Sequence, residues 1–128
     1  MVVRAITPSD APAWGALRRE LWPENPESHA VEIAAFFANG IEEPVAVLVA
    51  EDSAGAIIGF AELSIRFDVA GLEQMRTGYI EGLYVIPQAR GRGVAGELLR
   101  AVRPWARQME CVALASDRAG RVIIDPLL

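Results

Sequence analysis

The sequence has one cysteine, Cys111, one histidine, His29, and no lysine. A single cysteine forms neither an internal disulfide nor a cysteine metal cluster, so we expect no disulfide-framed secreted domain and no bound metal. No apolar run reaches the roughly 18 residues that a membrane span needs, and no signal-peptide pattern of a basic start and small-residue cleavage site is present. These absences predict a cytoplasmic protein with no membrane segment.

Positive charge is also scarce, because 12 arginines face 17 acidic residues, giving a net charge of -5 and an isoelectric point near 4.9. Such a field repels a nucleic-acid backbone, and no stripe of interleaved basic and aromatic residues offers a groove for one, so we expect no nucleic-acid partner. Residues 1–87 carry a net charge of -8, whereas residues 88–128 carry +3. This split indicates either solvated surface charge or an acidic face for a cation beside a basic face for an anion.

Length and periodicity predict one α/β domain over residues 1–128, built on a mixed sheet with the element order β-α-α-β-β-β-α-β. A chain of 128 residues is long enough to bury a sizeable core without covalent staples. Alternation of apolar residues predicts strands, and apolar spacings of three and four predict helices. The expected strands are 2–6, 45–51, 57–65, 76–86 and 111–115, and the expected helices follow residue 10 and cover 27–39 and 93–108.

Side-chain spacing also predicts which residues are buried. The first helix has one apolar stripe, formed by Trp14, Leu17 and Leu21. Cys111 lies in an apolar strand, where packing is expected rather than nucleophilic chemistry. In the second helix His29 is expected at the surface, and the inward residues are expected to be Val31, Ala34, Ala35 and Phe36.

A glycine-rich segment, residues 87–96 (PQARGRGVAG), lies between a predicted strand and a predicted helix. Glycines let successive backbone N–H groups point at one spot, and the helix N-terminus adds partial positive charge. Two arginines, Arg90 and Arg92, flank that spot. The segment therefore predicts a phosphate or pyrophosphate site, and the alternative is a tight turn with solvent-facing arginines.

The same segment also contains the dinucleotide fingerprint G-x-G-x-x-G, with Asp117 positioned 21 residues after Gly96. A doubly wound fold would need a second βαβ half on a parallel sheet. Here a helix pair and a hairpin precede the motif instead, and few residues follow it. We therefore set the nicotinamide-cofactor interpretation aside.

Read as Arg90-x-x-Gly93-x-Ala95, the loop resembles the acetyl-CoA pyrophosphate loop of the GNAT (Gcn5-related N-acetyltransferase) superfamily, whose element order agrees. Within it the chain resembles the aminoglycoside 6'-N-acetyltransferases over residues 1 to about 117. The segments that carry this resemblance are 17–23 (LRRELWP), 58–61 (IGFA), 64–68 (SIRFD), 80–85 (IEGLYV) and 115–117 (ASD).

The resemblance implies acetyl transfer from acetyl-CoA, as cosubstrate, to the 6'-amine of an aminoglycoside antibiotic by direct attack, hence antibiotic resistance. It also implies that backbone groups of a splayed strand hold the pantetheine and the acetyl carbonyl. The implied cofactor-binding residues are Leu83, Val85, Arg90, Gly91, Arg92, Gly93, Val94 and Ala95.

The catalytic residues implied by the resemblance are Glu81 and Asp117. An ammonium is no nucleophile, so a carboxylate must accept its proton before attack, and donors must stabilise the oxyanion. Glu81 is the candidate base because a carboxylate within a central strand requires explanation. An outward-facing or arginine-paired glutamate is the alternative, and Asp117 is the second candidate for proton handling.

The implied acceptor-binding residues are Trp22, Asp68, Glu81 and Asp117. The two aspartates would bind other ammonium groups of the acceptor, and Trp22 would wall the site. Core packing for Trp22 and ordinary turn roles for the aspartates are the alternatives. An acidic cleft for a polycation and a basic loop for CoA phosphates would together account for the split in charge.

Residues 118–128 depart from the family pattern, which continues with a loop, a helix and a final strand. We therefore expect a GNAT-like fold whose C-terminal helix and strands are largely missing. Residues 122–124 are expected to cover the edge left open near Ala115, either in the same chain or across a homodimer. The alternatives in function are acetylation of another small amine, or a catalytically impaired remnant that binds CoA or dimerises.

Overall fold

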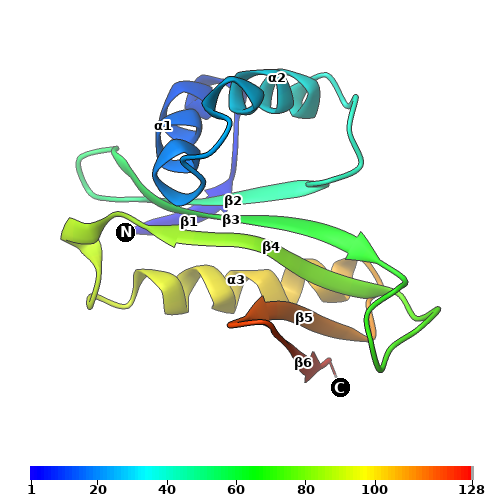
Figure 1. Cartoon of the computed structure of the whole chain (residues 1–128). Helices are drawn as coiled ribbons and strands as arrows, with labels where there is room; N and C mark the ends of the chain where they lie inside the picture. Colours follow the sequence, from blue (N-terminus) through cyan, green and yellow to red (C-terminus); the bar gives the residue numbers. More distant parts are fainter. Residues whose placement is uncertain (128) are drawn as a thin grey trace.

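The computed structural model describes residues 1–127 and shows one mixed sheet with helices on both faces (Figure 1). α1 and α2 cover one face, and α3 covers the other. The elements are β1 (Val2–Ala5), a 3-10 turn (Pro8–Asp10), α1 (Ala11–Leu21), α2 (Pro26–Phe37), β2 (Ala46–Glu51), β3 (Ile57–Arg66), β4 (Thr77–Val85), a second 3-10 turn (Pro87–Ala89), α3 (Val94–Gln108), β5 (Ala113–Arg118) and β6 (Arg121–Pro126). Among the described residues, no helix has the length and hydrophobicity that crossing a lipid bilayer requires.

The six strands lie in chain order, β1-β2-β3-β4-β5-β6. Every neighbouring pair is antiparallel except β4 and β5, which are parallel because α3 carries the chain back across the sheet. The predicted hairpin joins β2 to β3, and the Asp52 carboxylate accepts hydrogen bonds from the N–H groups of Ala54 and Ala56 in its turn. The predicted mixed α/β class and element order are thus confirmed.

The core beneath α1 and α2 confirms the first predicted apolar stripe and corrects the second. Trp14 is fully buried, with Phe36 and Phe37 against its ring edge-on. In α2, however, Val31 and Ala34 are exposed, whereas His29 and Ile33 are buried. The inward stripe therefore runs through positions 29, 33, 36 and 37, because His29 finds polar partners inside the protein.

β4 is splayed away from β5 along half of its length. It pairs with β3 from end to end, but with β5 only between Thr77 and Ile80. The β3–β4 register shifts between Glu62 and Leu63, so that Glu81 has no opposite residue on β3. A bulge of this kind re-aims side chains, and here it turns Glu81 and Gly82 toward the same face, the one below α1 and α2.

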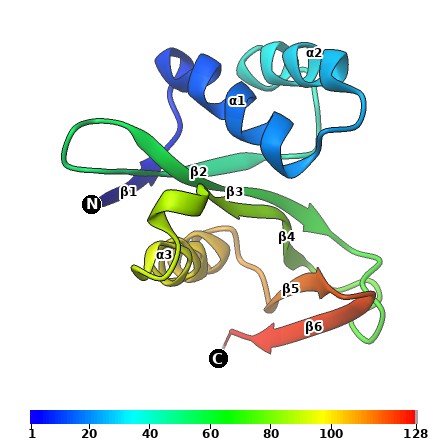
Figure 2. The same ribbon diagram turned by 60° about the vertical axis from the view of Figure 1, so that its left-hand side comes forward.

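The C-terminal residues form a hairpin with β5 rather than an irregular tail. Ala115 lies opposite Ile124, and Arg118 opposite Arg121, across the turn at residues 119–120. The expected cover for the open edge is therefore supplied by the same chain. Figure 2 shows β6 as the outermost strand, with the C-terminus at its end. Within residues 1–127, α3 is the last helix, and β5 and β6 follow it.

Candidate active site

The glycine loop and the start of α3 form the first part of the site. Gly91 and Gly93 adopt left-handed backbone conformations, with φ of 78° and 82°, which favour glycine. The first hydrogen bond of α3 runs from the N–H of Glu97 to the carbonyl of Gly93. The N–H groups of residues 94–96 therefore have no partner within the helix and are available to an anion.

The space in front of these N–H groups is open. A methyl group built on Gly91, Gly93 or Gly96 would meet no heavy atom within 4 Å. Behind the loop, Arg90 Nε donates a 2.9 Å hydrogen bond to the carbonyl of Val85, which ties the loop to β4. The loop thus offers unpaired N–H donors and open space at the position where the sequence predicts a phosphate.

A cleft of about 500 Å³ continues from this loop along β4. It contains every predicted cofactor-binding residue except Arg92, which is exposed and does not line it. Four lining residues were not predicted from the sequence: Leu21, Tyr84, Ala89 and Gly96. The full lining is Leu21, Leu83, Tyr84, Val85, Ala89, Arg90, Gly91, Gly93, Val94, Ala95 and Gly96.

The backbone of Leu83 and Val85 faces the open side of β4. Ile86 N–H donates to the carbonyl of Ile58 on β3, so alternation turns the groups of Val85 and Leu83 the other way. The bond from Arg90 to the Val85 carbonyl agrees with this direction. Because β5 does not pair with this part of β4, the backbone groups of Leu83 are accessible from the cleft.

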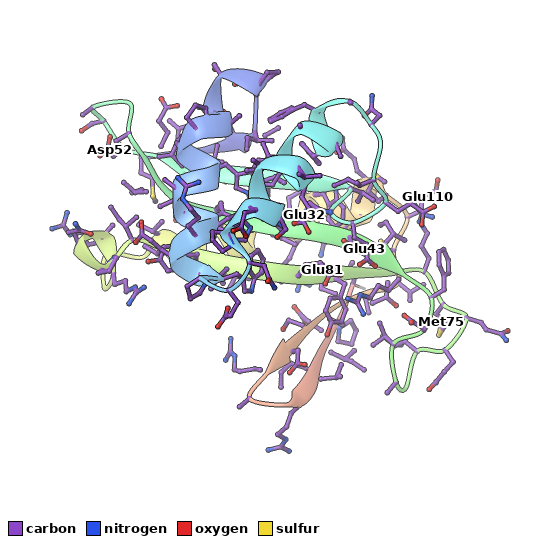
Figure 3. All side chains as sticks on the ribbon, turned by 45° about the horizontal axis from the view of Figure 1, so that its top comes forward. Glu32, Glu43, Asp52, Met75, Glu81 and Glu110 are labelled. Atoms are coloured by element: carbon purple, nitrogen blue, oxygen red, sulfur yellow. The ribbon has the colours of Figure 1, made fainter. Side chains whose placement is uncertain are left out.

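A second cavity, of about 540 Å³, lies between the α1–α2 pair and the sheet. It brings Trp22 and Glu81 together, as the sequence predicted, and adds carboxylates that the sequence did not single out. Figure 3 shows Glu32, Glu43 and Glu81 gathered between α2 and strands β3 and β4. The cavity is lined by Arg18, Trp22, Glu24, Asn25, Ser28, His29, Glu32, Ile41, Glu43, Pro44, Glu62 and Glu81.

The floor of this acidic cavity is a buried ion pair. Arg18 Nε lies 2.6 Å from Glu62 Oε2, and both side chains are almost completely buried. Trp14 Nε1 donates to the same Glu62 oxygen at 2.9 Å. Burial alone lowers the pKa of Arg18, but hydrogen bonds and charge from Glu62 and Glu32 outweigh it and raise that pKa. The guanidinium therefore stays charged, with Glu62 as its buried counter-ion.

Trp22 both lines the cavity and packs, so its two predicted roles coexist. The Arg18 guanidinium lies 5.2 Å from the centroid of the Trp22 ring. His29 contacts the Trp22 carbonyl through Nε2 and Arg18 through Nδ1, which accounts for the burial of that histidine. A Cβ on Gly82 would come within 2.5 Å of Trp22 Cη2, so the ring rests directly on the strand.

Glu81 is paired with an arginine, which was one of the two interpretations from the sequence. Arg66 donates through Nε and Nη2 to the two carboxylate oxygens, and its guanidinium lies 4.1 Å from the Tyr79 ring centroid. The hydrogen bonds to Glu81 raise the pKa of Arg66. The pair orients the Glu81 carboxylate at the edge of the acidic cavity.

Asp68 and Asp117 are exposed and do not line the acidic cavity. They lie near Tyr79, a residue that the sequence did not point to. Burial raises the pKa of the Tyr79 hydroxyl, Arg66 opposes that change, and the charges of Asp117, Glu81 and Asp68 add to it. Of the four predicted acceptor residues, Trp22 and Glu81 therefore line the acidic cavity, whereas Asp68 and Asp117 do not. Glu81 also lies near Tyr79, as the two aspartates do.

Other candidate groups take structural positions. Cys111 is buried, and burial raises the pKa of its thiol, which fits the predicted packing role. Among the described residues, no cluster of three or more histidine, cysteine, aspartate or glutamate side chains is placed to hold a metal ion. Glu62, like Glu81, is a carboxylate inside a central strand, but it was not among the site residues predicted from the sequence.

The chain matches known acetyltransferases over most of its length. The Acetyltransferase (GNAT) family matches residues 13–121. The "Aminoglycoside N(6')-acetyltransferase type 1" of Klebsiella aerogenes is 39% identical over 117 residues, which are 91% of this chain and 77% of that protein. The protein of the same name from Stenotrophomonas maltophilia is 42% identical over 116 residues, which are 90% of this chain and 73% of that protein.

Solved structures agree with the sequence matches. The aminoglycoside acetyltransferase AAC(6')-Iy, solved with the bisubstrate analog CoA-S-monomethyl-acetylneamine, superposes with a TM-score of 0.81 at 32% identity, covering 92% of this chain and 79% of that one. The apo 6'-N-acetyltransferase AAC(6')-IG of Acinetobacter haemolyticus gives a TM-score of 0.80 at 34% identity, covering 93% and 80%. Taken with the loop, the splayed strand and the cleft beside it, these matches make the chain a member of the acetyltransferase (GNAT) family.

Proposed function

We propose that this protein transfers the acetyl group of acetyl-CoA to the 6'-amine of an aminoglycoside antibiotic. The observation that carries the proposal is the meeting of two different sites on β4. Glu81 borders the acidic cavity, and Leu83, two residues further along the strand, lines the cleft that begins at the glycine loop. Two residues of a strand span about 7 Å, a distance over which an amine and a thioester can be brought into contact.

Acetyl-CoA fits the cleft on the donor side. The open space over Gly91 and Gly93 and the free N–H groups at the start of α3 suit a pyrophosphate. The backbone groups of Leu83 and the N–H of Val85 suit the amide-bearing pantetheine arm, which needs an extended strand edge to bond to; the Val85 carbonyl already accepts from Arg90. A second anion-binding contribution comes from Arg90, whose side chain lies against the loop.

The acidic cavity fits a polycationic acceptor. Five carboxylates line it, against one lining arginine, Arg18, and Arg66, which pairs with Glu81 at the edge. A concave site with an excess of one charge concentrates ligands of the opposite charge. Asp68 and Asp117 lie near Tyr79, and their carboxylates offer a further place for an ammonium group. This position supports the acceptor role predicted for the two aspartates.

The chemistry follows from the positions of two groups. Bound acetyl-CoA would supply a thioester carbonyl that an unprotonated amine attacks directly. Glu81 would accept the proton of the ammonium, through water, before attack. The outward-facing N–H of Leu83 would donate to the oxygen of that carbonyl as negative charge develops on it. The new N–C bond would then replace the C–S bond of the thioester, and the departing CoA thiolate would take up the proton that the attacking nitrogen loses. The proposal requires no metal, and it places the reaction in the cytoplasm.

The chain spans 77% and 73% of the two relatives named above. A competing function is CoA binding without turnover. CoA binding and turnover separate the two functions. A rise in melting temperature with CoA, together with acetylated product identified by mass, is expected for the enzyme. The same rise with no acetylated product, for aminoglycosides and simple polyamines alike, would favour CoA binding alone.

A further inference from the structure

His29 is a buried histidine for which the proposed reaction has no use. It lies in the first turn of α2 and is only 3% exposed, yet it belongs to the lining of the acidic cavity. An imidazole in such a place has two candidate roles. It is either a base that accepts a proton from a bound amine, or a side chain that holds another residue in position. Its hydrogen bonds distinguish the two.

Both ring nitrogens of His29 are engaged by the protein. Nδ1 lies 3.1 Å from Arg18 Nη1, and Nε2 lies 2.8 Å from the carbonyl oxygen of Trp22. A guanidinium can only donate, so Nδ1 must be the acceptor of the first bond. A carbonyl oxygen can only accept, so Nε2 must carry the hydrogen of the second. The two contacts therefore assign a neutral ring with its proton on Nε2, and neither nitrogen is available to a ligand.

The partner on the Nδ1 side is itself fixed. Arg18 Nε lies 2.6 Å from Glu62 on β3, and Arg18 Nη1 lies 2.5 Å from Glu32 on α2. A guanidinium held by two carboxylates has little freedom to turn, because its donors lie in one rigid plane. His29 is therefore attached through Arg18 to the centre of the sheet.

The partner on the Nε2 side is the end of α1. Trp22 follows the last helical residue, and its φ of -126° and ψ of 80° take the chain out of the helix. A continuing helix would bring the N–H of residue 26 to the Trp22 carbonyl, but Pro26 has no N–H to donate. His29 supplies the missing donor. Because the Trp22 N–H donates to the Arg18 carbonyl at 2.7 Å, both backbone groups of Trp22 are then bonded.

The side chain of Trp22 lies where the two sites of the molecule meet. A Cβ on Gly82 would come within 2.5 Å of Trp22 Cη2, so the ring rests on the residue between Glu81 and Leu83. The same ring forms part of the wall of the acidic cavity. The direction in which Trp22 leaves α1 therefore sets the shape of the acidic cavity next to Glu81.

We propose that His29 is a positioning residue for the acceptor, which holds the Trp22 ring over Gly82 by donating from Nε2 to the Trp22 carbonyl. This role rests on the proposed function, because the acceptor is the polycation that the acidic cavity would bind. His29 acts through Trp22 and takes no proton from the amine. The affinity for the acceptor is the quantity that it controls, whereas CoA binding and proton transfer belong to other residues.

Two substitutions separate the two hydrogen bonds of the ring. His29→Gln places an amide nitrogen near the position of Nε2, so it keeps a donor for the Trp22 carbonyl and gives up the acceptor for Arg18. His29→Asn places an amide oxygen near the position of Nδ1, so it keeps the acceptor but is too short to reach the carbonyl. Both replace a buried ring by a smaller amide, and similar decreases in melting temperature are expected. Val31→Ala, at an exposed position of α2 outside the cavity, is the control.

The first measurement needs no activity. The indole N–H signal of Trp22 in a nitrogen–proton NMR spectrum, assigned with Trp22→Phe, reports the surroundings of the ring. We expect this signal to move in His29→Asn and to stay in place in His29→Gln and Val31→Ala.

The second measurement is steady-state kinetics with tobramycin as the acceptor. The KM for tobramycin should rise about fivefold in His29→Asn, the equivalent of one hydrogen bond, and by less than about twofold in His29→Gln. The dissociation constant for CoA and the shape of the pH dependence of kcat/KM should be unchanged in both variants, since neither touches the cleft or Glu81.

Three results would overturn the inference. They are an indole signal that stays in place in His29→Asn, a KM that rises equally in both variants in step with their melting temperatures, and a changed pH dependence in His29→Gln, which would make the imidazole a base. If His29→Asn fails to fold, His29→Gln decides, because a moved indole signal in that variant contradicts the role of the Nε2 bond. A wild type that acetylates no aminoglycoside would refute the proposed function instead, and the indole signal would still show whether His29 holds Trp22.

Discussion

Arg66 holds the Glu81 carboxylate at two points, with 2.8 Å from Nε to Oε2 and 2.7 Å from Nη2 to Oε1. This pairing fixes the carboxylate at the bulge of β4, between the acidic cavity and the cleft. A two-point hydrogen bond from a planar guanidinium orients a carboxylate more strictly than a single charge does. Arg66 is therefore a positioning residue for the proposed base.

Replacement of that base tests its role. Glu81→Gln retains the size of the side chain and one acceptor oxygen for Arg66 but removes its ability to accept a proton. We expect kcat to fall about a hundredfold, whereas the dissociation constant for CoA stays nearly unchanged, because the cleft is lined by other residues. Steady-state kinetics and CoA titration measure the two quantities. Unchanged turnover would remove Glu81 as the base.

The contact between Gly82 and Trp22 predicts a cost for one added methyl group. Gly82→Ala would place a Cβ 2.5 Å from Trp22 Cη2, so the ring must move. We expect a loss of about 1–3 kcal/mol in unfolding free energy and a higher KM for the acceptor. Gly96→Ala is the matched control, since a Cβ there meets nothing within 4 Å and alanine favours a helix. Equal stability of the two variants would contradict the close contact.

The buried pair of Arg18 and Glu62 predicts strong non-additivity. Arg18→Met leaves the Glu62 carboxylate buried without its cation and should destabilise the protein by about 3–5 kcal/mol. Arg18→Met/Glu62→Leu removes both charges and should recover much of that loss, although Trp14 Nε1 loses its acceptor. Denaturant unfolding of the two single variants and the double variant completes a mutant cycle. Additive losses would show that the two side chains are not coupled.

Asp10 predicts a component of acid sensitivity. Hydrogen bonds from Arg4 hold the pKa of the Asp10 carboxyl far below its usual value near 3.8. Because the folded-state pKa is the lower one, the stabilisation is complete above the unfolded pKa and is lost as the pH falls toward the folded pKa. Unfolding free energy measured from pH 6 down to pH 3 should therefore fall less steeply in Asp10→Asn than in the wild type. Identical slopes would contradict this assignment.

The parts of the fold that local pattern determines could be predicted from the sequence. The glycine loop is contiguous, its physical requirements are local, and its predicted residues line the cleft with the exception of Arg92. α3 follows from its apolar stripe, and β1 to β5 follow from alternating or continuous apolar runs; β3, for example, is buried at six consecutive positions. The bulge that turns Glu81 and Gly82 to the same face depends on the β3–β4 register, which no local pattern contains.

The buried ionic cluster shows where such prediction stops. Arg18 and Glu62 lie 44 residues apart and are stable in the interior only because they meet there. His29 was assigned to the surface because a polar side chain without a partner avoids the interior. Its partners, Arg18 and the Trp22 carbonyl, come from tertiary structure. Because His29 turns inward, the prediction that Val31 and Ala34 of α2 are buried was wrong, whereas Phe36 packs on Trp14 as predicted.

The most direct test of the central claim is turnover with two aminoglycosides that differ only at the 6' position, one carrying an amine and the other a hydroxyl. Thiol release from acetyl-CoA would be followed for each, with wild type and Glu81→Gln, and the product identified by mass. The account predicts release with the 6'-amine alone, one added acetyl group, and a large loss in the variant. Equal release with both compounds, or none with either from a protein that still binds CoA, would contradict it.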